Sequence, residues 1–329
     1  MLRELITKLA GFTAPSGSEQ ALAEYLLSIV KDYADETYID TLGNAVAHKR
    51  GDGPHTLLTA HMDEPGVMVI HIDDCGFLRL VSVGNLAPTQ LIGRQILFSN
   101  GVHGVLQAEQ VKDKEAITFD KLYVDIGASS KEAAQDSVYI GLAGVVTEEL
   151  VSIGDHALSG RALDNRVGCA VAIEVFRQAA ADGKQVTLAF TSQETVGNRG
   201  IKTVAHRVQP DWALVIDGVP AGDTPGSKRM EVKLGKGPAV KIMDKSIVVP
   251  VAVKDHLIDA AKSANVDVQF EVRPDAGSDA GTLHLSTTGI PTGGISYPVR
   301  YVDSSSPIVD LRDAEQCVQI LLKAVQSKA

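Results

Sequence analysis

Hydrophobic residues near the N-terminus recur with helical spacing. Leu22, Leu26 and Val30 fall on one face of a helix, because about 3.6 residues make one turn. The preceding residues 16–19 have the pattern of a capping box, in which Ser16 accepts hydrogen bonds from the first-turn amides. We therefore predict a helix that begins directly after this box.

Short apolar runs alternate with helical segments through most of the chain. This alternation is typical of an α/β fold, and we predict a mixed, largely parallel sheet covered by helices on both faces. The predicted strands are residues 37–39, 46–48, 56–60, 186–191, 212–216 and 293–296, and the predicted later helices are residues 165–181, 255–264 and 314–325.

Residues 66–149 interrupt this alternation with short β-rich runs separated by Gly and Asn. Such a pattern is typical of a small all-β barrel or sandwich. We expect an inserted barrel-like domain at residues 66–149, while residues 1–65 and 150–329 form one discontinuous α/β domain. The predicted strands of the insertion are residues 67–71, 77–83, 95–98, 104–106 and 138–147.

The composition limits the classes of binding partner and the cellular compartment that we expect for this protein. The 329 residues carry a net charge of −10, which argues against nucleic acid or an anionic membrane as a partner. No stretch reaches the roughly 18 to 20 apolar residues that span a bilayer, and the N-terminus lacks the pattern of a signal peptide. Cys75, Cys169 and Cys317 are too scattered for a disulfide framework, so we expect a reducing, cytoplasmic location.

Ionisable residues lie at the ends of several predicted strands. His61 and Asp63 follow one strand, and Glu194, Asp217 and Asp303 follow three others. The carboxyl ends of parallel strands share one edge of the sheet, where α/β proteins bind their ligands. One imidazole with several carboxylates suits zinc, cobalt or manganese, and such a cluster of carboxylates would repel itself without a cation.

Each of these residues also has a purely structural explanation. An aspartate after a strand often forms an Asx turn, and Asp164 with Asn165 can cap the helix that follows them. A lone His61 can be a buried histidine with its hydrogen bonds satisfied. The coincidence across separate strands favours a site, and an unpaired buried carboxylate at Glu194 would be costly as a packing element.

Eight short segments, in their order and spacing, resemble one known family nearly end to end. This is the tetrahedral aminopeptidase and glutamyl aminopeptidase family, some of whose members are labelled cellulase-like endoglucanases. The matching segments are residues 14–17, 41–44, 60–66, 162–168, 193–200, 221–226, 278–281 and 309–313.

The resemblance implies a phosphorylase/hydrolase-like catalytic domain with a β insertion that serves oligomerisation and substrate access. It also implies a large homo-oligomer, commonly a tetrahedral dodecamer, that acts on short peptides. Two divalent metals in such sites lie about 3.5–4 Å apart and activate a water molecule that attacks the peptide bond.

Matched by position, five residues take roles from this family. His61, the bridging Asp164 and Asp217 would hold one metal. Asp63 would orient His61 through a hydrogen bond to its second ring nitrogen. Glu194 would be the general base, which takes the proton of water and passes it to the leaving amine.

The ligands of the second metal depart from the family pattern. Thr195 stands where the family has a ligand glutamate, and Asp303 stands where it has a histidine. A threonine hydroxyl binds zinc poorly compared with a carboxylate. We hypothesise that one metal site is intact and the other is weak, remodelled or absent, so the chain would hold one or two ions, with zinc or cobalt favoured over manganese.

The leading functional hypothesis is a metal-dependent aminopeptidase that releases N-terminal residues from short peptides. The retention of His61, Asp63, Asp164, Glu194 and Asp217 supports it. The first alternative is a weak or inactive family member that acts as a peptide-binding or scaffold subunit, and Thr195 and Asp303 favour it. The second alternative is a hydrolase of a related amide substrate.

Overall fold

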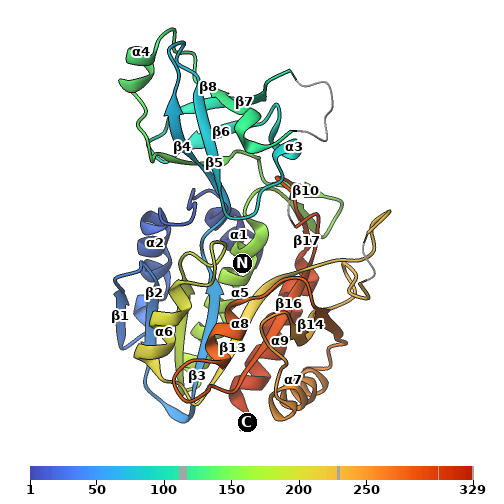
Figure 1. Ribbon diagram of the computed structural model, residues 1–329. Coiled ribbons are helices and arrows are strands. Elements are labelled where there is room, and N and C mark those ends of the chain that lie inside the picture. The colour runs from blue at the N-terminus through green and yellow to red at the C-terminus, as the bar shows by residue number, and fades with distance from the viewer. Residues whose placement is uncertain (111–116, 228–229, 303, 328–329) are drawn as a thin grey trace.

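The computed structural model describes residues 1–110, 117–227, 230–302 and 304–327 (Figure 1). Within these residues the strands form a mixed sheet of eleven strands and a closed barrel of six. The barrel lies at one end of the α/β part, as Figure 1 shows. The predicted fold class, a mixed α/β sheet with an inserted β-barrel, is therefore confirmed.

Four neighbouring parallel strands form the centre of the sheet. Their residues are buried almost throughout, because helices cover both faces, and this explains why their sequences read as continuous apolar runs. Since the strands are parallel, their carboxyl ends meet at one edge. In spatial order they are β12 (Lys184–Thr191), β3 (Asp52–His61), β13 (Trp212–Pro220) and β16 (Thr292–Arg300).

Shorter strands extend the sheet on both sides, mostly with antiparallel pairing. On the side of β12 lie β2 (Ala45–Lys49) and β1 (Glu36–Ile39). On the side of β16 lie β17 (Ile308–Asp310), β11 (Ala157–Ser159) and β10 (Val151–Ile153), and β14 (Ala239–Asp244) and β15 (Gln269–Arg273) branch from β16.

The helices divide into two groups by their contacts. In the first group three helices pack on the long helix α5 (Leu163–Ala181), and they are α1 (Leu2–Ala10), α2 (Gln20–Val30) and α9 (Leu311–Gln326); α7 (Val251–Ala264) packs on α9. The second group, α6 (Gly200–Val208) and α8 (Asp279–His284), packs on β12, β13 and β16. No helix in the described part of the chain is long and apolar enough to cross a membrane.

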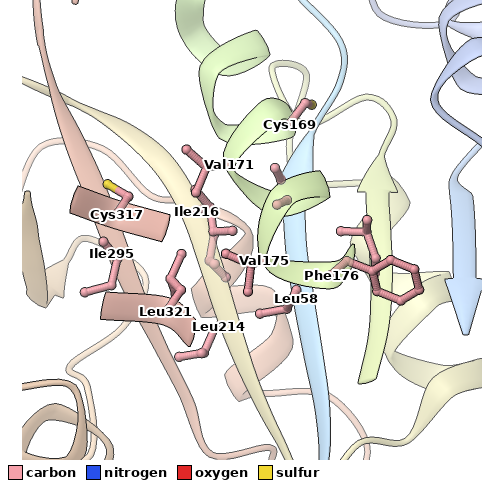
Figure 2. Packing of buried hydrophobic residues seen from close by; sticks show 14 of the residues in the cluster. Leu58, Cys169, Val171, Val175, Phe176, Leu214, Ile216, Ile295, Cys317 and Leu321 are labelled. Atoms are coloured by element: carbon pink, nitrogen blue, oxygen red, sulfur yellow. The ribbon is translucent and has the colours of Figure 1, made fainter. Parts of the chain in front are cut away.

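The main hydrophobic core lies between the sheet and α5. Val175 and Phe176 of α5 pack with Leu58 of β3 and Leu214 of β13 (Figure 2). Cys317 and Leu321 of α9 belong to the same cluster. This core fixes α5 against the sheet, and α5 begins at the edge where the strands end.

The barrel has a hydrophobic core of its own, which includes Val67, Leu80 and Leu106. Two short helices, α3 (Pro88–Leu91) and α4 (Lys131–Gln135), accompany it. Around the barrel the strands follow the order β4 (Gly66–Ile72), β5 (Leu78–Val83), β8 (Leu122–Asp125), β7 (His103–Ala108), β6 (Gln95–Phe98) and β9 (Ala143–Val146).

Two local predictions are wrong. The N-cap of α2 is Glu19 and makes no side-chain cap, while the Ser16 hydroxyl donates to Asp63 Oδ2 at 2.6 Å. Ser16 cannot reach the helix because its backbone N–H bonds to Glu64 O at 3.3 Å, beside the end of β3. The strand predicted at residues 138–147 spans only Ala143–Val146, because a turn with Gly141 at φ +93° precedes it.

A buried ion cluster joins the N-terminal segment, the end of β3 and the start of α5. Glu64 is 2% exposed, and its Oε1 accepts from Arg166 Nη2 at 2.9 Å and from Arg161 Nη1 at 2.5 Å. The backbone N–H of Ala14 donates to the same oxygen at 3.0 Å. Arg166 is fully buried, so its charge depends on Glu64 for compensation.

We predict that Glu64→Ala lowers the free energy of unfolding by about 3–5 kcal/mol, because it leaves a buried guanidinium without its carboxylate. Urea denaturation of the wild-type protein and of the Glu64→Ala variant measures this change. Asp259→Ala is the control, because its partner Lys262 lies 2.8 Å away in an exposed pair, and its effect on stability should be much smaller. A similarly small loss for Glu64→Ala would contradict the role of the cluster.

Candidate metal centre

The candidate site lies at the carboxyl edge of the four central strands. His61 is the last residue of β3, and Glu194 lies in the loop that follows β12. Asp217 lies within β13, three residues before its end, and not after a strand as predicted. Because Val215 of β13 pairs with Thr59 of β3, the register still places Asp217 at the level of His61.

Three side chains converge closely enough to hold one cation. His61 Nε2 lies 3.7 Å from Asp164 Oδ1 and 3.6 Å from Asp217 Oδ1. The ligand atoms of this group all lie within 4.8 Å of one another. Asp164 Oδ1 is buried and receives no hydrogen bond from any described residue, an arrangement that a bound cation would satisfy.

The turn before α5 positions Asp164. Ala162 is the N-cap, and Asp164 and Asn165 have non-helical backbone angles, so they do not cap the helix. Asn165 Nδ2 donates to Ile216 O at 2.9 Å, and Tyr297 Oη donates to Asn165 Oδ1 at 2.8 Å. These buried bonds tie the turn to β13 and β16.

The surroundings of His61 determine which ring nitrogen can bind a cation. Nδ1 lies 3.2 Å from Asp63 O and 3.5 Å from Asp63 Oδ1, and both oxygens only accept. Nδ1 therefore carries a hydrogen, which leaves Nε2 to face Asp164 and Asp217. Burial lowers the pKa of His61, but the charge of Glu194 and the attraction of the nearby aspartates outweigh it and raise the pKa well above its ordinary value.

Asp63 connects His61 to two other segments. Its carboxylate accepts from Ser16 Oγ at 2.6 Å, from the N–H of Glu194 at 3.0 Å and from the N–H of Thr195 at 3.1 Å. Burial raises the pKa of Asp63, yet the bond and charge of His61 leave it below its ordinary value. An ionised Asp63 thus fixes both the imidazole and the loop that carries Glu194.

Glu194 lies beside the three converging side chains, in a cavity of about 370 Å³. Burial raises the pKa of Glu194 to about 8; His61 opposes the shift, and the charges of Asp279 and Asp217 add to it. His61 and Asp164 line the same cavity, and Leu86 of the barrel domain borders it. The cavity therefore brings a weakly acidic carboxyl group close to the candidate metal ligands.

Of the two altered positions, Thr195 does not join this group. Thr195 Oγ1 lies 2.6 Å from Ser16 Oγ, whose own hydrogen goes to Asp63, so the Thr195 hydroxyl donates to Ser16. Asp303 lies outside the described residues. Among the residues that are described, the histidine, cysteine and carboxylate groups that could share one ion are His61, Asp164 and Asp217.

Sequence reasoning assigned no role to two neighbours of Glu194. Asn198 Nδ2 donates to Glu194 Oε1 at 2.9 Å and to Asp279 Oδ1 at 3.1 Å. Asp279 is 2% exposed, and burial raises its pKa to about 6 against the bonds from Thr191 and Asn198, which lower it. Asn198 and Asp279 lie in segments that carry the family resemblance, and that resemblance was the signal by which they could have been found.

Known proteins share this fold along almost the whole chain. A putative aminopeptidase of Acetivibrio thermocellus is 41% identical over 323 residues, which cover 98% of each chain. The solved structure of an aminopeptidase from Desulfurococcus kamchatkensis has a TM-score of 0.94 at 32% identity and covers 99% of this chain and 95% of that one. The TET1 peptidase of Pyrococcus horikoshii, which can assemble into a tetrahedron or a large octahedral shell, has a TM-score of 0.90 at 28% identity, with 99% of both chains covered.

These relatives place the fold and its site in the class of aminopeptidases, which are hydrolases of peptide bonds. The family model described as M42 glutamyl aminopeptidase matches residues 43–320. The chain belongs to the M42 glutamyl aminopeptidase family. The resemblance inferred from its sequence is thereby confirmed.

We predict that zinc uptake at pH 7 releases protons, because the ion requires a neutral imidazole at His61. The pKa of His61 is raised well above its ordinary value, so the affinity for zinc should increase as the pH rises. Calorimetric titrations in buffers with different ionisation enthalpies measure this release. His206→Ala, at an exposed histidine of α6, should leave it unchanged, and a binding heat independent of the buffer would contradict the prediction.

Proposed function

We propose that the chain is a metal-dependent aminopeptidase that releases N-terminal residues from short peptides. The carrying observation is the convergence of His61, Asp164 and Asp217, together with Glu194 in the cavity that His61 and Asp164 line. In this proposal the first three residues hold a divalent cation and Glu194 is the general base. Family membership supports the aminopeptidase reaction.

The chemistry of the three side chains fits a divalent transition metal. Nε2 of His61 has a free lone pair in the neutral ring, and Asp164 Oδ1 lacks a hydrogen-bond donor among the described residues. One imidazole and two carboxylates suit zinc, cobalt and manganese. When bound, such an ion polarises a peptide carbonyl and lowers the pKa of water.

The side chains around this group perform the proton transfers in the proposed reaction. Glu194 takes a proton from the attacking water and then donates it to the leaving amine. Its raised pKa suits both steps near neutral pH, because the carboxyl group can return the proton that it accepts. Asp63 orients His61 and holds the backbone N–H of Glu194, so it acts on the reaction through these two residues.

We further propose that the chain binds one ion and not two. The Thr195 hydroxyl is bonded to Ser16, and its backbone N–H is bonded to Asp63. A neutral hydroxyl engaged in this way is a poor ligand for zinc or cobalt. The second ligand position at residue 195 therefore contributes no carboxylate beside Asp164.

Self-association is part of the proposal. The barrel domain at residues 66–149 would serve oligomerisation and substrate access, as a domain separate from residues 1–65 and 150–329. The solved TET1 peptidase assembles into closed shells, and a dodecamer is the assembly that we expect here. Exposed apolar residues on the barrel support a contact surface, and they are Ile70, Val81, Val105, Tyr139 and Ile140.

We predict that Glu194→Gln lowers kcat by about 10²–10⁴-fold on aminoacyl amides and short peptides, because the general base is lost. Bound metal should stay at the wild-type amount, since Glu194 is not among the three ligands. Glu24→Gln, at an exposed glutamate of α2, is the control and should keep full activity.

Two outcomes would redirect this proposal. Metal-loaded wild-type protein that turns over no free-amine peptide would favour a binding or scaffold role. Faster hydrolysis of N-acylated than of free-amine peptides would favour a hydrolase of a related amide.

We predict about one tightly bound ion per chain after dialysis against zinc or cobalt, because the described residues provide one group of three ligands. Elemental analysis measures the content directly. Asp217→Asn should lose most of this metal, and Thr195→Glu, which introduces a carboxylate at residue 195, should raise the content. Two tightly held ions per wild-type chain would show that Thr195 is tolerated and would overturn the single-ion proposal.

A further inference from the structure

The side-chain amide of Asn198 lies between the half-buried carboxyl group of Glu194 and the buried carboxyl group of Asp279. Its Nδ2 donates to Glu194 Oε1 at 2.9 Å and to Asp279 Oδ1 at 3.1 Å. An amide nitrogen has two hydrogens, and both are used here. The neutral amide therefore separates two carboxyl groups that would otherwise face each other without a donor.

Asp279, on the other side of the Asn198 amide, is itself held in place by a buried hydrogen bond. Asp279 Oδ2 accepts from Thr191 Oγ1 at 2.7 Å. Thr191 is the last residue of β12, and Asp279 is the first residue of α8. Both are buried, so Asn198 is bonded to a fixed point between the sheet and a helix.

The backbone of the loop also depends on residue 198. The N–H groups of Gly197 and Asn198 both donate to Glu194 O at 2.9 Å, which closes a tight turn. Asn198 has φ +52°, a left-handed conformation that asparagine and glycine tolerate better than other residues. The turn alone would accept glycine, but only the amide reaches both carboxyl groups.

We infer that Asn198 and Asp279 are positioning residues that hold the Glu194 carboxylate for proton transfer. The inference rests on the proposed role of Glu194 as general base. Asn198 engages Oε1 and leaves Oε2 without a hydrogen bond from any described residue, so Oε2 is the oxygen that accepts the proton of water. Asp279 orients the amide of Asn198, and its charge also contributes to the raised pKa of Glu194, so the kcat values below are compared at the pH optimum of each variant.

The first test is Asn198→Gly, because glycine keeps the left-handed backbone and removes only the amide. We expect kcat to fall about 10–100-fold on a free-amine peptide, as for a misplaced catalytic group. KM and the metal content per chain should stay close to the wild-type values. A merely structural role would change stability and leave kcat intact.

The second test separates Asp279 from Asn198 by a double-mutant cycle. Asp279→Asn keeps an oxygen that can accept from Asn198, so its kcat should stay within about threefold of wild type. Asp279→Ala removes that oxygen and should lower kcat alone, but add little in the Asn198→Gly background, because its effect passes through the amide. If Asp279→Ala does not fold, the contrast between Asn198→Gly and Asp279→Asn still decides the matter.

The outcomes distinguish this inference from the proposed function. Wild-type kcat in Asn198→Gly, or independent losses in the cycle, would overturn the positioning role while the aminopeptidase activity stands. Metal-loaded wild-type protein without turnover, measured in the same assay, would overturn the proposed function and this inference with it.

Discussion

The structure depends on a buried imbalance of charge at the edge of its central sheet. His61 is surrounded by Asp63, Asp164, Asp217 and Glu194, which are brought together by the carboxyl ends of three strands and the start of a helix. Buried carboxylates require compensation by protons, hydrogen-bond donors or cations. The raised pKa values of His61 and Glu194 are the response of the ion-free chain to this imbalance.

The permanent cations near the site do not remove this imbalance. Arg161 and Arg166 are paired with Glu64 on one side of the site. On the other side, buried Lys241 is paired with Asp244 at 3.1 Å and with Glu271. The arginine cluster has one positive charge in excess and the lysine cluster one negative charge in excess, so together they leave the negative charge of the group around His61 for a divalent ion to compensate.

The central part of this arrangement could be predicted from sequence, because it follows from chain direction. Parallel strands end at one edge, so His61, Glu194 and Asp217 had to lie close together once their strands were recognised. Asn198 and Asp279 could not be found in this way, since they are 81 residues apart and meet only through the packing of α8 on β13 and β16. Ser16 was assigned a wrong role for a related reason. The capping pattern considers only neighbouring residues, whereas the hydrogen-bond partner of Ser16 is Asp63, 47 residues away.

The β-barrel connects to the site through a very short segment. His61 ends β3 and Gly66 begins β4, so four residues join the sheet to the barrel, and two of them, Asp63 and Glu64, are bonded to the site and to the arginine cluster. Because the connection is so short, the barrel is attached to the sheet directly beside the imidazole of His61. A displacement of the barrel relative to the sheet would therefore act first on residues that are bonded to His61, to the loop of Glu194 and to the two arginines.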